Sequence, residues 1–169
     1  PESIAKLCAQ SKVKKFIHVS AIGASKDSKS KYQQSKFLGE EKALNNFNKT
    51  VIIRPSVVIG NEDNFTNLFA KLSLSPIIPV VNVNYKFEPI FVNDVARAIL
   101  KAIETKNNEG KIYELGGGRV ISFGDMIKLI LSTIGKKRIV ADVPMTLAKI
   151  QSSLLGLLPI DPIITKDQC

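Results

Sequence analysis

Apolar residues in the first third of the chain fall into two short runs, with helical spacing before and between them. Residues 2–11 predict the end of a helix. Residues 13–20 and 50–54 are nearly continuous apolar runs, typical of strands buried on both faces of a parallel sheet. Residues 31–46 predict an amphipathic helix between them. This alternation of helix and strand indicates right-handed crossovers within a parallel sheet.

Beyond residue 60 the alternation becomes less regular. The polar residues 61–64 predict the cap of a helix, and Pro76 and Pro79 break the next apolar segment into an irregular or edge strand. Residues 89–92 predict a short strand. Asn93 and Asp94 then predict the cap of another helix, since their short polar side chains accept hydrogen bonds from the first turn.

The last third predicts two more strands and two more helices. Ser122 predicts the cap of the first helix, which Gly135 ends. Pro144 begins the second, which reaches about Leu155 and precedes a proline-rich tail. In order, the segments are a strand at 111–115, a turn at 116–118, a helix at 123–134, a strand at 138–143 and the final helix.

The composition is that of one soluble globular domain with a basic surface. The chain has 169 residues, 44% of them hydrophobic, and a formal net charge of +9. Only four of the 24 basic residues are arginine, whose planar fork dominates phosphate and base recognition. No nucleic-acid motif is present, so the charge predicts a solvated surface with affinity for acidic partners or anionic lipid headgroups.

The cysteines and the ends of the chain bear on where the protein resides. Cys8 and Cys169 lie near opposite ends, which predicts no disulfide framework and a reducing compartment. No apolar run approaches the roughly 18 residues of a membrane span. The chain opens with Pro1 inside a predicted helix, and we expect it to be a piece of a longer protein.

Ser20, Tyr32 and Lys36 are the candidate catalytic residues. Tyr32 and Lys36 stand four residues apart and therefore share one face of the predicted helix. An ammonium group beside a phenol favours the phenolate, which brings proton exchange closer to neutral pH. Ser20 ends the preceding strand and can offer a hydroxyl to the same substrate oxygen. The alternative is a Tyr and a Lys exposed on a solvated helix.

Other candidate sites have simpler explanations. Gly116–Gly118 follows a predicted strand, but Ile121 occupies the place of the third glycine in a dinucleotide fingerprint, so we interpret the segment as a turn. We interpret His18 as a packed core residue of its strand. One histidine and two distant cysteines predict no metal site. Asp63 and Asp94 could pair as acids, although helix caps or loops explain both.

Three segments carry a resemblance to a known superfamily: residues 16–21, 32–36 and 54–60. They resemble the extended or atypical branch of the short-chain dehydrogenases/reductases, the branch of the NAD-dependent nucleotide-sugar epimerases and dehydratases. The implied fold is α/β: the C-terminal half of a Rossmann-like, doubly wound parallel sheet plus a small α/β C-terminal region. Residues 1–60 would form the second half of the NAD(P)-binding domain, and residues 61–169 the smaller region, interleaved with the last sheet elements.

Further segments carry a narrower resemblance. Residues 60–70, 76–79, 89–95 and 158–168 are similar to the Rossmann-type accessory subunits of respiratory complex I (NADH dehydrogenase, or NADH:ubiquinone oxidoreductase) and their bacterial relatives. This resemblance implies complex I subunits as partners. It also implies a cytoplasmic location, free or peripheral on the inner face of a bacterial membrane, or the matrix side in mitochondria.

The superfamily resemblance also assigns roles by position. Tyr32 would exchange the proton as hydride moves to or from a nicotinamide, Lys36 would bind the nicotinamide ribose, and Ser20 would orient the substrate oxygen. The cofactor is NAD or NADP, and the choice is unreadable because the Gly-rich phosphate loop is absent from these residues. The residues that would contact the cofactor are Tyr32, Lys36, Pro55, Ser56, Val57 and Val58.

Two classes of function stay open, with a stand-alone interaction module as a third. One is a cofactor-holding structural or assembly protein of complex I, favoured by residues 60–70 and 158–168. The other is an oxidoreductase or epimerase acting on a quinone precursor, a nucleotide sugar or another small carbonyl substrate, favoured by the complete Ser-Tyr-Lys set. The apolar residues 154–158 fit either docking on a membrane complex or a helix buried on its own domain.

The missing half-site leads to a prediction. We expect the 169 residues alone to bind NADH or NADPH poorly, because only the nicotinamide side of the site is present. Isothermal titration calorimetry checks this, and micromolar binding of NADPH by the isolated chain would contradict it.

Overall fold

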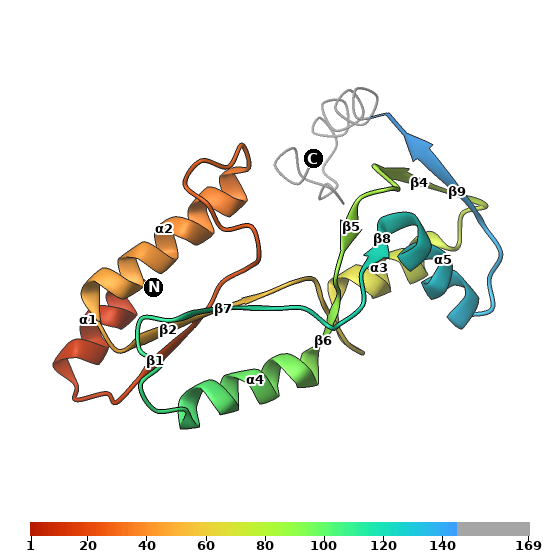
Figure 1. Cartoon of the computed structure of the whole chain (residues 1–169). Helices are drawn as coiled ribbons and strands as arrows, with labels where there is room; N and C mark the ends of the chain where they lie inside the picture. Colours follow the sequence, from red (N-terminus) through yellow and green to blue (C-terminus); the bar gives the residue numbers. More distant parts are fainter. Residues whose placement is uncertain (145–169) are drawn as a thin grey trace. The chain divides into compact units, whose positions relative to one another are not determined.

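The computed structural model describes residues 1–144, which divide into two compact units (Figure 1). Unit one contains Pro1–Val58 and Pro89–Gly118. Unit two contains Ile59–Glu88 and the described residues from Arg119 on, 119–144. The predicted helix from Pro144 to Leu155 and the tail after it lie outside the described residues.

A three-stranded parallel sheet forms the centre of unit one, as the sequence predicts. Its order is β1-β2-β7, with His18 opposite Ile52 and Ile53 opposite Tyr113. The neighbours are parallel in both pairs, so the carboxyl ends of all three strands point to one edge. The bounds are β1 Phe16–Val19, β2 Thr50–Pro55 and β7 Ile112–Leu115.

Helices cover both faces of this sheet. Figure 1 shows α1 and α2 on one face and α4 on the other. Alternate residues of β2 explain the two layers, since Val51 and Ile53 pack with Ala102 of α4, while Thr50 donates its hydroxyl to the Phe47 carbonyl after α2. The bounds are α1 Glu2–Gln10, α2 Lys31–Asn46 and α4 Val92–Glu104.

Strand β1 corrects one sequence prediction. The apolar run 13–20 predicts burial on both faces, yet β1 is half-buried, with Val19 exposed, whereas Val51–Ile53 of β2 are fully buried as predicted. Within residues 1–144 β1 pairs with β2 alone, whereas β2 has a strand on each side, so β1 makes fewer contacts.

Helix α4 has a different beginning from the one predicted. Asn93 and Asp94 do not cap it: Phe91 occupies the N-cap position, without a side-chain hydrogen bond. Asp94 instead lies in the first turn and pairs with Arg97 at 3.3 Å. A first-turn carboxylate still complements the positive end of the helix dipole, which explains why the motif looks like a cap.

A lysine caps the other end of α4. Lys15 Nζ donates hydrogen bonds to the carbonyls of Ala102 at 3.0 Å and Thr105 at 2.5 Å, and to Asn108 Oδ1 at 2.6 Å. These carbonyls belong to the last turn, which has no intrahelical donors. A cation at this end also interacts favourably with the negative end of the helix dipole. Lys15 therefore links the residue before β1 to the C-terminal end of α4.

Unit two packs two helices on two small strand pairs. β4 and β9 are parallel, with Ile77 opposite Ile139, and β5 and β8 are antiparallel. The buried core consists of Phe69, Ile78, Val80, Met126, Ile127, Ile130 and Leu131. The bounds are α3 Asn64–Leu72, β4 Ile77–Val81, β5 Lys86–Phe87, β8 Ile121–Ser122, α5 Phe123–Thr133 and β9 Ile139–Val143.

Phe65 is the centre of an aromatic group within this core. Its ring lies 5.3 Å from Phe69, 6.0 Å from Phe87 and 5.8 Å from Phe123, measured between ring centroids. Edge-to-face and offset contacts at these distances stabilise a core beyond the area they bury.

Two further short strands are β3 Val58–Ile59 and β6 Ile90–Phe91.

Predicted caps of unit two are confirmed. Asp63 accepts hydrogen bonds from the Thr66 backbone N–H and hydroxyl and from the Gly60 N–H, and Ser122 accepts from the Asp125 N–H. Burial raises the pKa of Asp63, but these donors outweigh it and lower the pKa below its usual value. Asp63 is therefore a cap and not a member of a catalytic acid pair.

Replacing Asp63 tests this role. Asp63→Ala leaves three donors without their acceptor and should lower the free energy of unfolding by about 1–2 kcal/mol. Asp63→Asn keeps one acceptor oxygen and should cost less. Urea unfolding followed by circular dichroism measures both, and an Ala variant as stable as the wild type would contradict the assignment.

Candidate nicotinamide-side site

The structure brings Tyr32 and Lys36 together on one face of α2. Ser30 is the N-cap, accepting from the Gln33 N–H at 3.4 Å, so Tyr32 lies in the first turn. Lys36 Nζ lies 5.6 Å from the centroid of the Tyr32 ring, within cation–π range. Tyr32 is 47% exposed and Lys36 half-buried. The predicted pairing of the two side chains is confirmed, and its use in chemistry remains a prediction.

Ser20 lies directly after β1, at the carboxyl edge of the sheet. Its N–H donates to the Ile53 carbonyl at 2.7 Å, which continues the β1–β2 ladder by one residue. Although the residue is only 5% exposed, Ser20 Oγ is a buried side-chain oxygen with no hydrogen-bond partner within residues 1–144. The structure thus does not join Ser20 to the Tyr32 phenol. A buried hydroxyl without a hydrogen-bond partner destabilises the folded state, and a ligand that forms a hydrogen bond with this oxygen would remove that penalty.

The segment Pro55–Val58 follows β2 at the same edge. Pro55 is buried, the Ser56 N–H donates to the Leu115 carbonyl at 2.9 Å, and the Val57 carbonyl accepts from Ile90 N–H at 2.9 Å. Ser20, Ser56 and the residue after Leu115 therefore mark the carboxyl ends of three parallel strands. Open α/β sheets bind ligands outside these ends.

The glycines after β7 do not form a phosphate loop. A β-carbon on Gly117 would lie 2.1 Å from the carbonyl oxygen of Pro89, so the close approach of two backbones requires glycine there. Gly118 has a φ of +82°. The chain continues into the short strand β8 and not directly into a helix. The structure has a bend at Gly118, while a turn over the whole of Gly116–Gly118 stays a prediction.

An ion network holds α2 against the sheet, and sequence reasoning missed it. Arg54 of β2 donates from Nε and Nη2 to the two oxygens of Glu40, at 2.9 and 2.7 Å, and from Nη1 to Glu114 of β7 at 3.2 Å. These bonds, above all those to Glu40, raise the pKa of Arg54 above its ordinary value. An arginine ending an apolar strand was the available signal, because a charge there needs a partner.

The loop between Ser20 and α2 is fastened by Gln33. Ser28 Oγ donates to Gln33 Oε1 at 2.5 Å, and Gln34 Nε2 donates to the Ser28 carbonyl at 2.7 Å. Gly23, with a φ of +85°, leaves room for the Gln33 amide, since a β-carbon would lie 2.6 Å from Gln33 Nε2. The loop after Ser20 therefore packs directly against the first turn of α2.

His18 packs beneath α2, in agreement with its interpretation as a packed strand residue. Its Nε2 lies 3.6 Å from the place where a β-carbon of Gly39 would sit. Burial lowers the pKa of His18 below its ordinary value; the charge of Glu40 opposes this, and the charge of Lys36 lowers the pKa further.

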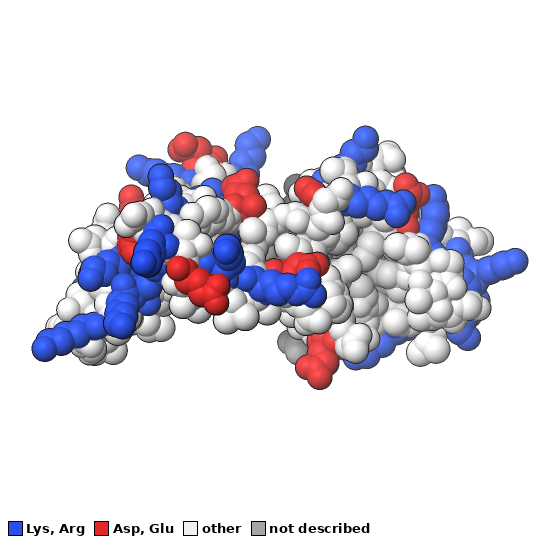
Figure 2. Space-filling model, turned by 60° about the horizontal axis from the view of Figure 1, so that its bottom comes forward, with Lys and Arg blue, Asp and Glu red and all other residues white. Residues whose placement is uncertain are grey.

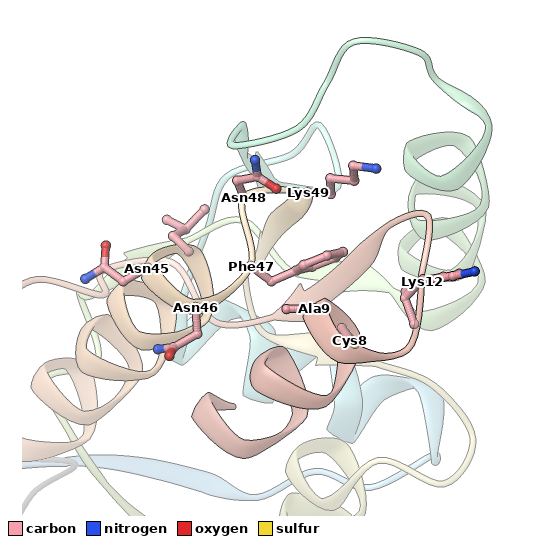
Figure 3. Close-up of a pocket in the computed structure, with 10 residues that line it drawn as sticks. Cys8, Ala9, Lys12, Asn45, Asn46, Phe47, Asn48 and Lys49 are labelled. Atoms are coloured by element: carbon pink, nitrogen blue, oxygen red, sulfur yellow. The ribbon is translucent and has the colours of Figure 1, made fainter.

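The pocket in Figure 3 lies away from this edge. It has a volume of about 410 Å³ and collects residues from the ends of α1 and α2, which precede β1 and β2. It is therefore at the amino ends of the strands, where parallel sheets do not usually bind ligands. Its lining residues are Cys8, Ala9, Lys12, Val13, Leu44, Asn45, Asn46, Phe47, Asn48 and Lys49.

Residues 1–144 contain neither a metal-binding cluster nor a membrane-spanning helix. No group of three or more His, Cys, Asp or Glu side chains there could hold a metal ion. In the same residues, no helix has the length and apolar character needed to cross a bilayer.

Residues 23–153 match the family described as RmlD substrate binding domain. The chain belongs to this family. Its RmlD-type fold is also seen in dTDP-4-dehydrorhamnose reductase from Bacillus anthracis in complex with NADP, with a TM-score of 0.73 and 22% identity over 86% of this chain and 56% of that one. MoeE5 in complex with UDP-glucose and NAD has a TM-score of 0.70 and 14% identity, over 85% and 56% of the two chains. At these identities the likeness establishes the Rossmann-like fold alone.

Closer relatives by sequence carry the name of a respiratory subunit. NADH dehydrogenase (ubiquinone) 1 alpha subcomplex subunit 9, mitochondrial, from Mus musculus is 32% identical over 99% of this chain. The protein of that name from Dictyostelium discoideum is 37% identical over 70% of it. The chain covers 45% and 34% of these relatives, respectively, and so spans less than half their length. The narrower resemblance seen in the sequence is confirmed.

The low pKa of His18 predicts how stability changes with pH. The neutral form is favoured in the folded state, so stability is greatest above the unfolded pKa of about 6.5 and falls as pH drops through the lower folded value. His18→Gln removes this proton uptake. We expect wild type to lose more stability than His18→Gln between neutral and mildly acidic pH, measured by urea unfolding. Parallel profiles for the two proteins would contradict the assignment.

Proposed function

We propose that the chain supplies the nicotinamide side of an NAD(P)-binding site in a short-chain dehydrogenase/reductase-like accessory subunit of respiratory complex I. The single observation that carries the site is the Tyr32–Lys36 pair on the helix that Arg54 binds to the sheet. Relatives over 99% of the chain bear the name of such a subunit, which supports the respiratory assignment. The protein's task is then to hold the cofactor and stabilise an assembly.

The residues present fit such a cofactor. Lys36, half-buried and with three donors, would bind the hydroxyls of the nicotinamide ribose. The unpartnered Ser20 Oγ would donate to an oxygen of the ligand. Pro55, Ser56, Val57 and Val58 would line the wall beside it. When bound, the cofactor would supply hydride chemistry, and NAD and NADP are both compatible with these residues.

The solvent exposure of Tyr32 favours a structural role over a catalytic one. Its side chain is half-exposed, and a proton-exchanging phenol works best where water is excluded. The second candidate function, an active oxidoreductase or epimerase on a carbonyl substrate, rests on one observation: Ser20, Tyr32 and Lys36 are all present. A purely structural protein has no chemical need of the phenol.

The proposed place of action follows from the proposed partner. As a subunit of NADH:ubiquinone oxidoreductase, the protein would lie on the cytoplasmic side of a bacterial inner membrane, or on the equivalent matrix side in mitochondria. The relatives named above are mitochondrial proteins.

Tyr32→Phe distinguishes the two functions, because it removes only the phenolic oxygen. In cells whose own gene is deleted, the full-length Tyr32→Phe protein should restore the assembled oxidoreductase to the wild-type amount. Native gel electrophoresis with an NADH-oxidation stain measures this.

The matched control is Tyr113→Phe, which removes a phenolic oxygen from β7 of the same unit. If Tyr32→Phe accumulates normally yet fails to rescue, while Tyr113→Phe rescues, the structural role is contradicted and catalysis is supported. If neither variant affects rescue, the enzyme hypothesis fails.

A further inference from the structure

Two turns meet at one end of the β4–β9 pair in unit two. Because the strands are parallel and Ile77 lies opposite Ile139, the turn after α3 and the turn after α5 reach the same end. Arg138 Nε donates to the Ser73 carbonyl at 2.7 Å, and the Ile139 N–H donates to the Pro76 carbonyl at 3.1 Å. The two turns are therefore bound to each other.

Large apolar side chains project from these turns. Leu74 is 84% exposed, Ile139 is 65% exposed and Ile77 is 49% exposed. Their neighbours Ile78 and Val80 are buried in the core, so the strand pair is apolar on both sides. Single exposed leucines are common on soluble proteins, but Ile77 and Ile139 are paired in the β4–β9 register, and contiguous exposed apolar residues are typical of interaction sites. Leu74, Ile77 and Ile139, with Lys136 and Lys137 beside them, are called the turn patch below.

The two segments that form the turn patch carry charge of one sign. Residues 64–81 and 126–141 contain no aspartate or glutamate. Their basic residues are Lys71, Lys128, Lys136, Lys137 and Arg138. Lys128 is paired with Asp125, whereas Lys136 and Lys137 are exposed next to Ile139. Figure 2 shows Lys and Arg side chains spread over the face in view, so it is the apolar centre that distinguishes the turn patch.

We propose that the turn patch docks on a lipid surface that carries anionic headgroups. Protruding leucine and isoleucine side chains enter the boundary between headgroups and acyl chains, and the lysines beside them bind lipid phosphates. A fluid bilayer accepts a side chain as exposed as Leu74 without a matching pocket, whereas a protein partner needs a complementary surface. The absence of acidic groups from both segments removes the repulsion that anionic lipid would otherwise meet.

This inference does not rest on the nicotinamide-side site, since the two involve different units of the chain. A failure of cofactor binding leaves the turn patch unaffected. A failure of lipid binding likewise leaves Tyr32 and Lys36 as they are. The experiment can therefore be interpreted separately from the proposed function.

The test is co-sedimentation of the full-length protein with vesicles. Binding should be clear with phosphatidylcholine mixed with phosphatidylglycerol and weak with phosphatidylcholine alone. Leu74→Ser combined with Ile139→Thr should weaken binding at least about tenfold, because two apolar side chains no longer enter the bilayer. Lys136→Gln combined with Lys137→Gln should weaken it by a similar factor, since each cation near an anionic surface contributes about fivefold.

Controls come from the same unit. Val120→Ser removes an equally exposed apolar side chain, and Lys86→Gln with Arg119→Gln removes two exposed cations outside the turn patch. Their binding should stay within about twofold of wild type, and circular dichroism should show that all variants remain folded. Equal binding to neutral and anionic vesicles, or equal loss in the controls, would overturn the proposal. So would lysine variants that bind vesicles normally but no longer bind the purified oxidoreductase, because the partner would then be an acidic protein.

Discussion

The candidate site depends on the two hydrogen bonds by which Arg54 holds Glu40. The Glu40 side chain is 3% exposed, and a carboxylate so deeply buried is tolerated only with a hydrogen-bonded partner. Glu40 lies one helical turn after Lys36, and Arg54 comes directly before Pro55. The same contact therefore fixes the helix that carries the Tyr32–Lys36 pair and the strand that leads to the proposed cofactor wall. Removing Arg54 would leave the buried Glu40 carboxylate without this partner, whereas removing Glu40 would leave Arg54 paired with Glu114 alone.

Smaller contacts hold the rest of the arrangement. Gln33 fastens the loop after Ser20 to the first turn of α2, and His18 packs beneath the helix near Gly39. These contacts hold α2 against a short parallel sheet whose carboxyl edge carries Ser20. Such an edge can present a hydroxyl and an ammonium group to a ligand, as the proposed function requires. The turn patch of unit two is a separate feature, built from two turns and one strand pair.

The sequence predicted most elements because their signals are local. Tyr32 and Lys36 share a face simply through helical spacing, and Asp63 and Ser122 cap helices through their own side chains. The failures have non-local causes. β1 looks like β2 in sequence, but burial depends on how many neighbours a strand has. Asp94 looks like a cap but pairs with Arg97. The Arg54 network joins residues 40, 54 and 114, and no spacing rule connects positions so far apart.

The most direct test of the nicotinamide-side site is calorimetry on the full-length protein with two ligands, NADH or NADPH and ADP. ADP lacks the nicotinamide and its ribose, so Lys36 should not contribute to its binding. If Lys36 binds that ribose, Lys36→Met should weaken binding of the dinucleotide by about tenfold or more and leave binding of ADP unchanged. Unchanged binding of the dinucleotide, or equal weakening of both ligands, would contradict the assignment.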